Sequence, residues 1–338
     1  MKKTILEVRN LHTHFYTDKG VVPAVDGVSF SLYEGEILGI VGESGCGKSV
    51  TSLSIMGLIP SPPGKIVDGE ILFRQQQSAG EKTEDLVKVS KKRLREIRGN
   101  QIAMIFQEPM TSLDPLFKIG DQIIEALRNH QRISKKEARK KAMELIKSVG
   151  IPRADEIVDE YPHQLSGGMR QRVMIAMAMA CDPEILIADE PTTALDVTIQ
   201  AQILELMKKL NREKGTAIML ITHDLGVVAE MCDRVIVMYA GKVVEEGPVR
   251  TILKEPKHPY TQGLIRSLPK LNKREKRLYS IPGQVPKPGS ILSGCRFAPR
   301  CEVAFSQCFA KDPELYRIKE GHQCRCFLYE KEEDIVHV

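Results

Sequence analysis

The segment 42–49, GESGCGKS, constrains the fold of this chain more than any other part of the sequence. It fits the phosphate-binding pattern G-x-x-x-x-G-K-[ST] and lies between an apolar run at 36–41 and a stretch with helical spacing at 48–58. Glycines at such a turn let backbone N–H groups converge on phosphate oxygens, and the helix that follows adds its dipole. We therefore predict a strand, a loop and a helix that bind a nucleoside triphosphate.

The end of this loop carries the residues with defined chemistry. Lys48 is expected to reach the β- and γ-phosphates, and the Ser49 hydroxyl is expected to ligate Mg²⁺. The predicted nucleotide contacts of the segment are Gly42, Glu43, Ser44, Gly45, Cys46, Gly47, Lys48, Ser49 and Val50.

A second segment, ILIADE at 185–190, is an apolar strand that ends in two acids. Two adjacent carboxylates at a strand end repel each other unless a cation or a reacting proton lies nearby. Asp189 suits the Mg²⁺ shell, and Glu190 suits the general base that polarises an attacking water. The strand-to-loop boundary by itself is a weak signal, and the phosphate loop upstream strengthens it.

A third segment, LSGG at 165–168, opens a predicted helix. The N–H groups after Ser166, at Gly167 and Gly168, would form a second anion site. One chain does not readily use two such helix ends on one nucleotide, so a head-to-tail pair of subunits is expected, with each γ-phosphate between the two motifs. Ser166 also suits a plain helix N-cap.

Strands and helices alternate along most of the chain, which predicts an α/β sheet with helices on its faces. Antiparallel strands are expected over 6–30, a polar loop over 75–82 and a basic surface segment over 88–98. Two helices are expected within 121–150, the second capped by Ser134. Beyond Gly247 a proline-rich composition predicts an irregular appendage.

Composition excludes several classes of protein. The net charge of +5 comes without a long basic run, Trp is absent and aromatic residues make up 5%, so a nucleic-acid partner is not expected. No apolar stretch is long enough to span a bilayer, and the N-terminus has no signal-peptide pattern. We expect a soluble cytosolic chain that reaches a membrane only through a partner.

The LSGG motif, with a phosphate loop before it and ILIADE after it, resembles the nucleotide-binding domain of ABC ATPases. The resemblance covers residues 6–247 and implies a P-loop ATPase with a RecA-like core, an antiparallel β subdomain and a helical subdomain. It implies an ATPase domain over 1–250, with the helical subdomain at about 110–170, and an extension over 251–338.

The same resemblance assigns further site residues. Gln107, at the end of IAMIFQEP, matches the glutamine that contacts Mg²⁺ and the attacking water. Ala194, Leu195 and Asp196 match the loop that crosses the dimer interface in that family. His223, in LITHDL, matches the histidine that contacts the γ-phosphate. Phe15 takes the place of the aromatic residue that stacks on adenine, and Tyr16 is the neighbouring alternative.

Motifs in the C-terminal part of the chain indicate a subgroup of this family. The motifs HPYT at 258–261, IPGQVP at 281–286 and GCRFAPRC at 294–301 resemble the ATP-binding subunits of bacterial oligopeptide and dipeptide importers, a group that includes nickel importers. This resemblance implies an ATPase that powers peptide import, with nickel or another small solute as the alternative. It implies a related second ATPase subunit, two transmembrane permeases and an extracytoplasmic binding protein, with the chain on the cytoplasmic face of the membrane.

The cysteines gather in the last part of the chain. The intervals from Cys295 to Cys301 and from Cys301 to Cys308 are wider than the paired hooks that zinc favours. The subfamily resemblance implies a [4Fe–4S] cluster on these three residues and Cys326, preferred to Cys324, with a structural or regulatory role. Zinc-bound or free thiols are the alternative.

Two other kinds of protein fit the sequence less well. An ABC ATPase of DNA repair or translation usually carries two cassettes or a long coiled coil, and the sequence shows neither. An iron–sulfur redox enzyme that uses ATP would need further redox motifs, which the sequence does not contain.

Overall fold

A computed structural model describes residues 3–77, 80–107, 112–193, 195–268, 279–286, 289–290 and 293–330. The chain divides into two compact units. The first unit comprises Met1–Ile5, Leu32–Ile37 and Lys88–Ile221, and the second unit comprises Leu6–Ser31, Leu38–Val87 and Thr222–Val338.

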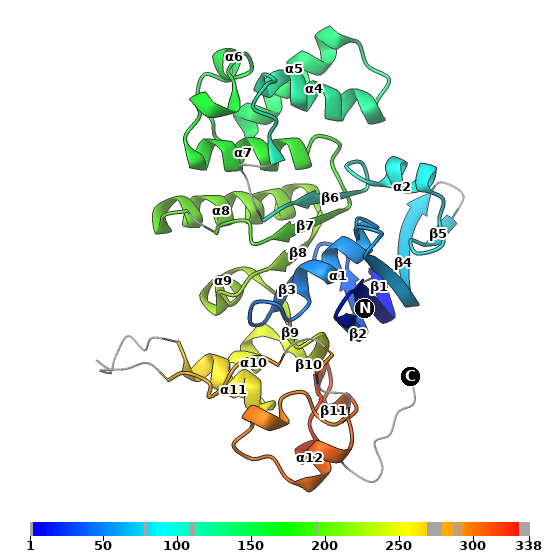
Figure 1. Cartoon of the computed structure of the whole chain (residues 1–338). Coiled ribbons are helices and arrows are strands. Elements are labelled where there is room, and N and C mark those ends of the chain that lie inside the picture. The colour runs from blue at the N-terminus through cyan, green and yellow to red at the C-terminus, as the bar shows by residue number, and fades with distance from the viewer. Residues whose placement is uncertain are drawn as a thin grey trace. The chain divides into compact units, whose positions relative to one another are not determined.

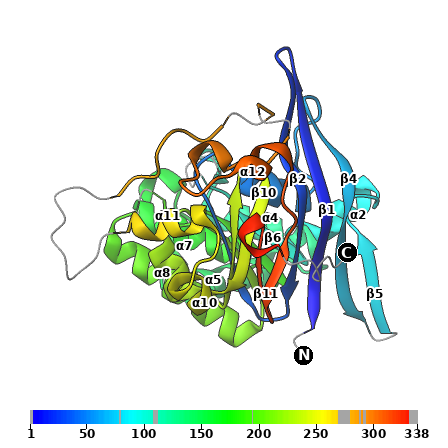
Figure 2. The same ribbon diagram turned by 90° about the horizontal axis from the view of Figure 1, so that it is seen from below.

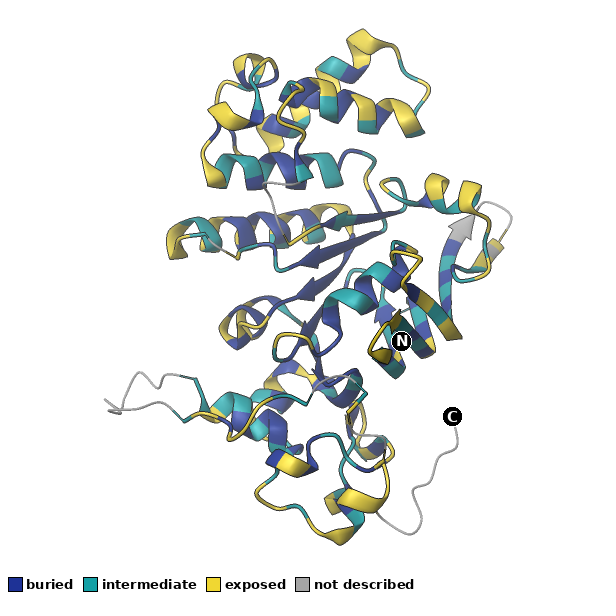
Figure 3. Cartoon of the chain, in the orientation of Figure 1, coloured by how far each residue is buried: buried dark blue, intermediate teal, exposed yellow. Residues whose placement is uncertain are grey.

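The first unit is built on a parallel sheet in which β7 (Ile185–Asp189) pairs with both β6 (Ile102–Ile105) and β8 (Ala217–Ile221). Every residue of β7 and β8 is buried, which Figure 3 shows as dark blue arrows. A parallel strand that is covered on both faces has a nearly continuous apolar sequence, and β7 and β8 both show this pattern. The sheet places the end of β7 at a fixed position.

Helices form the rest of the first unit. They are α2 (Lys91–Ile97), α4 (Ile119–His130), α5 (Lys135–Ser148), α6 (Ala154–Ile157), η1 (Pro162–Gln164), α7 (Gly167–Ala178) and α8 (Val197–Lys214). Figure 1 shows α4, α5 and α6 grouped on the far side of α7 from α8. The predicted cap at Ser134 is confirmed as a capping box with Glu137. Residues 88–98, expected as a basic surface segment, contain α2, which Ser90 caps.

The second unit contains an antiparallel sheet with strand order β2-β1-β4-β5. These strands are β1 (Thr4–Thr17), β2 (Gly20–Tyr33), β4 (Gly64–Gln77) and β5 (Gly80–Asp85), and Figure 2 shows β1, β2 and β4 running alongside one another. The predicted loop at 75–82 is wrong, because Gln75 pairs with Lys82 within the β4–β5 ladder, which continues to Gln77 and Gly80. The paired residues here are polar, so the segment lacks the alternating apolar pattern from which a strand is predicted.

The second unit also holds β3 (Ile37–Val41), which pairs in parallel with β9 (Arg234–Tyr239). Strand β10 (Lys242–Pro248) pairs antiparallel with β9, and then β12 (His322–Cys324) and β11 (Tyr316–Lys319) continue the ladder. Helix α1 (Lys48–Ile55) follows β3, and α9 (Leu225–Met231) precedes β9. The appendage is therefore less irregular than expected, since its last strands extend this sheet.

The C-terminal extension packs on this core. It contains α10 (Val249–Lys254), α11 (Pro259–Arg266), η2 (Ala298–Arg300), α12 (Ser306–Ala310) and η3 (Phe327–Tyr329). Tyr260, Ile281 and Phe297 join one apolar cluster with Val41 and Tyr239. The extension thus shares its core with the strand that leads into the 42–49 loop.

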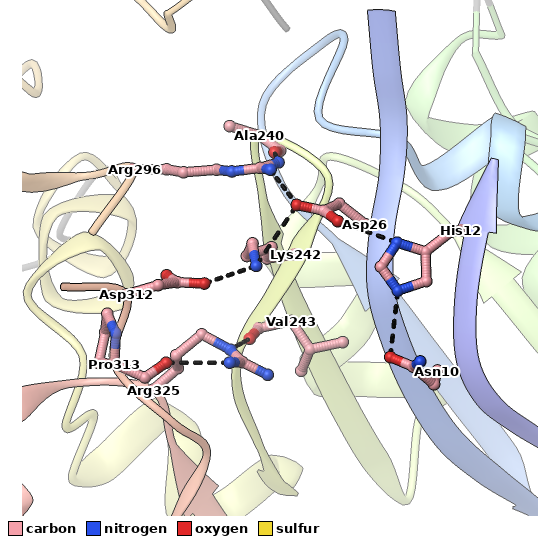
Figure 4. Close-up of polar contacts among 10 residues, drawn as sticks. All are labelled: Asn10, His12, Asp26, Ala240, Lys242, Val243, Arg296, Asp312, Pro313 and Arg325. Atoms are coloured by element: carbon pink, nitrogen blue, oxygen red, sulfur yellow. Dashed lines mark hydrogen bonds and ion pairs between the residues drawn. The ribbon is translucent and has the colours of Figure 1, made fainter. Parts of the chain in front are cut away.

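An ionic network also ties the extension to β2 (Figure 4). The Asp26 carboxylate pairs with Arg296 of the extension, lies 3.4 Å from the Lys242 Nζ and 3.0 Å from the His12 Nδ1. Arg296 also donates to the backbone carbonyl of Ala240. The extension is therefore anchored by charge as well as by apolar packing.

Candidate functional site

The 42–49 loop joins β3 to α1, as predicted, and its glycines are required by its backbone. Gly47 has φ of 102°, and a Cβ there would lie 2.5 Å from the carbonyl oxygen of Ala24. A Cβ on Gly42 would lie 2.2 Å from the carbonyl oxygen of Met238. A side chain fits at neither position, so the tight curve of the loop depends on both glycines.

Lys48 is buried and folds back over the loop. Its Nζ donates to the carbonyl oxygens of Gly42 at 2.8 Å and Glu43 at 3.2 Å. Cys46 lies beneath it, and burial raises the pKa of the Cys46 thiol. Ser44 and Gly45 are exposed, and Ser49 and Val50 are half-buried, so this side of the loop is accessible to a ligand.

The remaining candidates of the second unit come from separate elements. Phe15 is half-buried near the end of β1, where it packs against Gly64, whereas Tyr16 is 52% exposed. The neighbouring aromatic residue is thus the more accessible for stacking. His223 is exposed just before α9, whose N-terminus is capped by Asp224.

In the first unit the end of β7 holds the two acids. Asp189 is buried, and Glu190 has φ of 47°, an unusual conformation for a residue with a side chain. The Glu190 Oε2 accepts hydrogen bonds from the Gln107 Nε2 at 3.3 Å and the Thr193 Oγ1 at 3.0 Å. Backbone strain of this kind gathers at functional sites, and the role of Glu190 as the general base stays a prediction.

The LSGG segment begins α7. The Ser166 hydroxyl accepts from the Met169 N–H at 3.3 Å, and Ser166 and Gly167 are exposed. A Cβ on Gly168 would lie 2.9 Å from the Ile199 Cγ2 of α8. Asp196 caps α8 by accepting from the Ile199 N–H at 2.9 Å. The two predicted interface segments therefore meet here, while Ala194 lies outside the described residues.

The structure therefore distributes the predicted residues between the two units. In the first unit it brings Gln107 and Glu190 together, and Gly168 next to the helix that Asp196 caps. The second unit holds the 42–49 loop, Phe15, Tyr16 and His223.

Cysteines of the extension line one small apolar cavity with Phe297, Phe305 and Phe327. The cysteines that line it are Cys295, Cys301, Cys308 and Cys326. Cys324 is not among the lining residues and is fully buried on β12. Burial chiefly, with a smaller contribution from the neighbouring Cys326 and Cys308, raises the pKa of Cys295 to about 11, as expected for thiols that lie near one another.

The cysteine side chains do not form a metal site in the described part of the chain. The described residues contain no group of three or more His, Cys, Asp or Glu side chains that could hold a metal ion. The structure thus supports neither the zinc alternative nor the cluster directly. Ligands of one Zn²⁺ converge to about 2.3 Å from a single point, whereas a [4Fe–4S] cluster holds each thiolate on a different iron. The four cysteines line one cavity, and a [4Fe–4S] cluster bound by them stays a prediction.

Two residues of the extension, Tyr260 and Arg300, contact the phosphate loop at Glu43. Glu43 donates its N–H to the Tyr260 Oη at 2.8 Å, and its carboxylate pairs with Arg300 at 2.7 Å. Both partners lie in motifs that the sequence singled out, HPYT and GCRFAPRC, but only as signs of a subfamily.

Comparison with known proteins agrees with this geometry. Residues 25–193 match the model of the ABC transporter family, and residues 244–308 match that of the oligopeptide/dipeptide transporter C-terminal region. The chain is 55% identical to the oligopeptide transport ATP-binding protein AppD of Bacillus subtilis, over 97% of this chain and 98% of that one. The chain belongs to the ABC transporter family. Within it, the chain is an ATPase subunit of the oligopeptide/dipeptide group.

Other relatives and solved structures support the same family. The dipeptide transport ATP-binding protein DppD of Bacillus subtilis is 52% identical over 97% of this chain and 95% of its own length. The dimeric structure of MJ0796, a bacterial ABC transporter cassette, matches with a TM-score of 0.63 and 31% identity, over 72% of this chain and 99% of that one. The predicted ABC fold is therefore confirmed.

No helix among the described residues is both long and apolar enough to cross a membrane.

Proposed function

We propose that this ABC subunit hydrolyses ATP to power the import of di- or oligopeptides through a membrane transporter. The observation that carries the proposal is the joint presence of the ABC region at 25–193 and the oligopeptide/dipeptide extension at 244–308 in one chain. The names of its relatives AppD and DppD, for oligopeptide and dipeptide transport, favour peptides over nickel.

Nucleotide binding would use the 42–49 loop. Its backbone N–H groups and the N-terminus of α1 face the phosphates, and Lys48 exchanges its bonds to the Gly42 and Glu43 carbonyls for phosphate oxygens. Phe15 or Tyr16 would stack on adenine. The oxygens of Ser49, Gln107 and Asp189 are of the type that Mg²⁺ prefers, and the ion would neutralise phosphate charge.

Hydrolysis would use the contact between Gln107 and Glu190. Glu190 accepts a proton from water while the water oxygen attacks the γ-phosphorus and the bond to the ADP oxygen breaks. The hydrogen bond from the Gln107 amide, 3.3 Å in length, orients the Glu190 carboxylate for this transfer. His223 would contact the γ-phosphate.

A second subunit would complete each site. The exposed turn at Ser166, Gly167 and Gly168 would face the γ-phosphate bound by a related ATPase partner, and Asp196 would lie at the same interface. ATP binds the closed pair more tightly because these contacts exist only there, so closure and reopening can drive two permeases at the cytoplasmic face. An extracytoplasmic binding protein would deliver the peptide.

The cysteine cavity would hold a [4Fe–4S] cluster on Cys295, Cys301, Cys308 and Cys326. The support for this is that these thiols line one apolar cavity from which Cys324 is absent. Such a cluster would cross-link and stabilise the extension, and it would supply no electron to ATP hydrolysis.

The transport proposal is tested in proteoliposomes that contain this chain, its partner ATPase and its permeases, with the binding protein outside. ATP inside the vesicles should drive uptake of labelled di- and oligopeptides, while nickel uptake stays at background. Lys48→Ala should abolish uptake, and Lys140→Ala, 77% exposed on α5, should not. Nickel uptake without peptide uptake would refute the assignment.

A further inference from the structure

Glu43 is the second residue of the phosphate loop, at a position that the loop pattern leaves open. In this structure each of its polar groups is nevertheless held. Its N–H donates to the Tyr260 Oη at 2.8 Å, and its carbonyl accepts from the Lys48 Nζ at 3.2 Å. Its carboxylate accepts from the two terminal nitrogens of Arg300, at 2.7 and 3.2 Å. The residue that helps to hold Lys48 is thus itself held by the C-terminal extension.

Arg300 is built into its place. It is 9% exposed, its Nε donates to the Pro282 carbonyl at 2.8 Å, and its Nη1 also donates to the Tyr239 Oη at 3.2 Å. Its terminal nitrogens form a fork on the Glu43 carboxylate, and a lysine cannot reproduce that planar geometry. Because these contacts fix the guanidinium, Arg300 presents a fixed positive charge to the loop.

Tyr260 is equally constrained. It is fully buried and packs against Tyr239, with 4.6 Å between the ring centroids, and against Phe297 at 5.5 Å. Because the ring cannot turn away, its hydroxyl holds the Glu43 N–H and fixes the direction of the backbone at the start of the loop.

Charge makes the Arg300 contact more than a structural tie. The Glu43 side chain is 28% exposed and belongs to the loop that would receive the triphosphate. An unpaired carboxylate there would repel phosphate oxygens, and the attached arginine removes that repulsion. The pair therefore lets an acidic residue stay in a phosphate-binding loop.

We propose that Arg300 and Tyr260 are positioning residues for nucleotide binding, through which the C-terminal extension sets the affinity of the phosphate loop for ATP. The inference rests on the proposed binding of the phosphates at 42–49. Arg300 neutralises the Glu43 carboxylate, and Tyr260 fixes the Glu43 backbone. Together they hold in place the Glu43 carbonyl, which accepts a hydrogen bond from Lys48, the residue that would bind the phosphates. An extension that loosened would weaken ATP binding without touching the chemistry at Glu190.

The test measures the Kd of a fluorescent ATP analogue and the KM and kcat of ATP hydrolysis in the full chain with its partner subunits. Arg300→Met should weaken binding by about tenfold or more and raise KM more than it lowers kcat. Glu43→Gln, which removes the carboxylate charge, should weaken binding less than Arg300→Met does. The double variant should regain most of the affinity lost in Arg300→Met, because no carboxylate is left to repel phosphate.

Further variants keep the test decisive. Arg317→Met removes a positive charge from exposed β11 and should bind ATP as the wild type does. Arg300→Lys should recover only part of the affinity. If Arg300→Met does not fold, Tyr260→Phe, which deletes a single hydroxyl, should still weaken binding by about threefold.

Unchanged ATP affinity in a folded Arg300→Met variant overturns the inference, as does unchanged affinity in Tyr260→Phe. A double variant that binds no better than Arg300→Met overturns the role of charge. A wild-type chain that fails to bind ATP refutes the proposed function instead, so the two failures are distinguishable.

Discussion

The Gln107 side-chain amide donates a hydrogen bond to the Glu190 carboxylate, with 3.3 Å between the Nε2 and Oε2 atoms. The Thr193 hydroxyl donates to the same oxygen at 3.0 Å. These donors come from the segments that follow β6 and β7, two strands that pair in parallel and end at the same edge of the sheet. The sheet thus positions the two donors that orient the Glu190 carboxylate.

Glu190→Gln should abolish turnover while ATP binding remains. An amide cannot accept the proton of the attacking water, so the rate should fall by about 10²–10⁴-fold. ATP-bound dimers should accumulate, which size-exclusion chromatography with ATP would reveal beside an assay of phosphate release. Glu213→Gln, on the exposed side of α8, is the matched control and should hydrolyse ATP normally. Normal turnover in Glu190→Gln would refute the assigned base.

Gly167→Ala should separate the dimer contact from folding. Apart from its chain neighbours and the backbone of its own helix, no atom of the described residues lies within 4 Å of a Cβ at Gly167, so the stability of the chain should be unchanged or up to about 1 kcal/mol higher. The added methyl group would occupy the place of the partner's γ-phosphate, so ATPase activity of the dimer should fall by more than about tenfold.

The neighbouring glycine serves as the comparison. In Gly168→Ala the new Cβ would lie 2.9 Å from the Ile199 Cγ2, so this variant should lose thermal stability as well as activity. Wild-type activity in Gly167→Ala would show that the turn does not face a nucleotide.

Asp26→Asn should weaken the anchoring of the extension. It should also make the stability of the folded chain less dependent on acidic pH. Burial opposes ionisation of Asp26, but the charges of Lys242 and Arg296 outweigh it and hold the pKa below its ordinary value of 3.8. Between that lowered pKa and 3.8 the unfolded chain binds more proton at this group than the folded chain. Its stabilisation is therefore complete well above pH 3.8 and is lost as the pH falls through the folded pKa.

The variant should lose about 1–3 kcal/mol of stability at pH 7 and should show a flatter loss of stability between pH 5 and pH 3. Urea denaturation at a series of pH values measures both effects. Asp18→Asn, exposed at the turn between β1 and β2, should follow the wild type. Parallel pH profiles for Asp26→Asn and the wild type would exclude Asp26 as a source of acid sensitivity.

Cys301→Ser should remove bound iron from the chain purified without oxygen. The wild type should carry about four iron atoms and as many acid-labile sulfides per chain, and Cys324→Ala should keep them, because Cys324 does not line the cavity. Chelation should lower the thermal stability of the extension. Stoichiometric zinc in the wild type, or full iron content in Cys301→Ser, would contradict the assignment.

Much of the ATP site could be predicted from the sequence because its parts are local. The phosphate loop, the acids after β7 and the turn before α7 each take their backbone geometry from a few adjacent residues. A glycine at positive φ, an N-cap serine and an apolar strand act over short distances, so their spacing in the sequence carries their structure.

Local sequence patterns do not predict the structure where two polar strands pair. They also do not decide which of two nearby cysteines lines the cavity. The β4–β5 ladder has no apolar alternation near Gln75, so the sequence pattern predicts a loop there. The spacing alone could not separate Cys324 from Cys326. The structure separates them because β12 ends at Cys324, which is fully buried, and the chain then leaves the strand so that Cys326 lines the cavity.

The sequence by itself determined the family and its ATPase class, and it predicted the residues of the ATP site, since these lie in short contiguous motifs. Only the tertiary structure decided that Arg300 pairs with Glu43, which lies 257 positions away, and that Tyr260 holds the same residue. Contacts over such separations depend on how strands and helices pack into one core, and no local pattern encodes that packing.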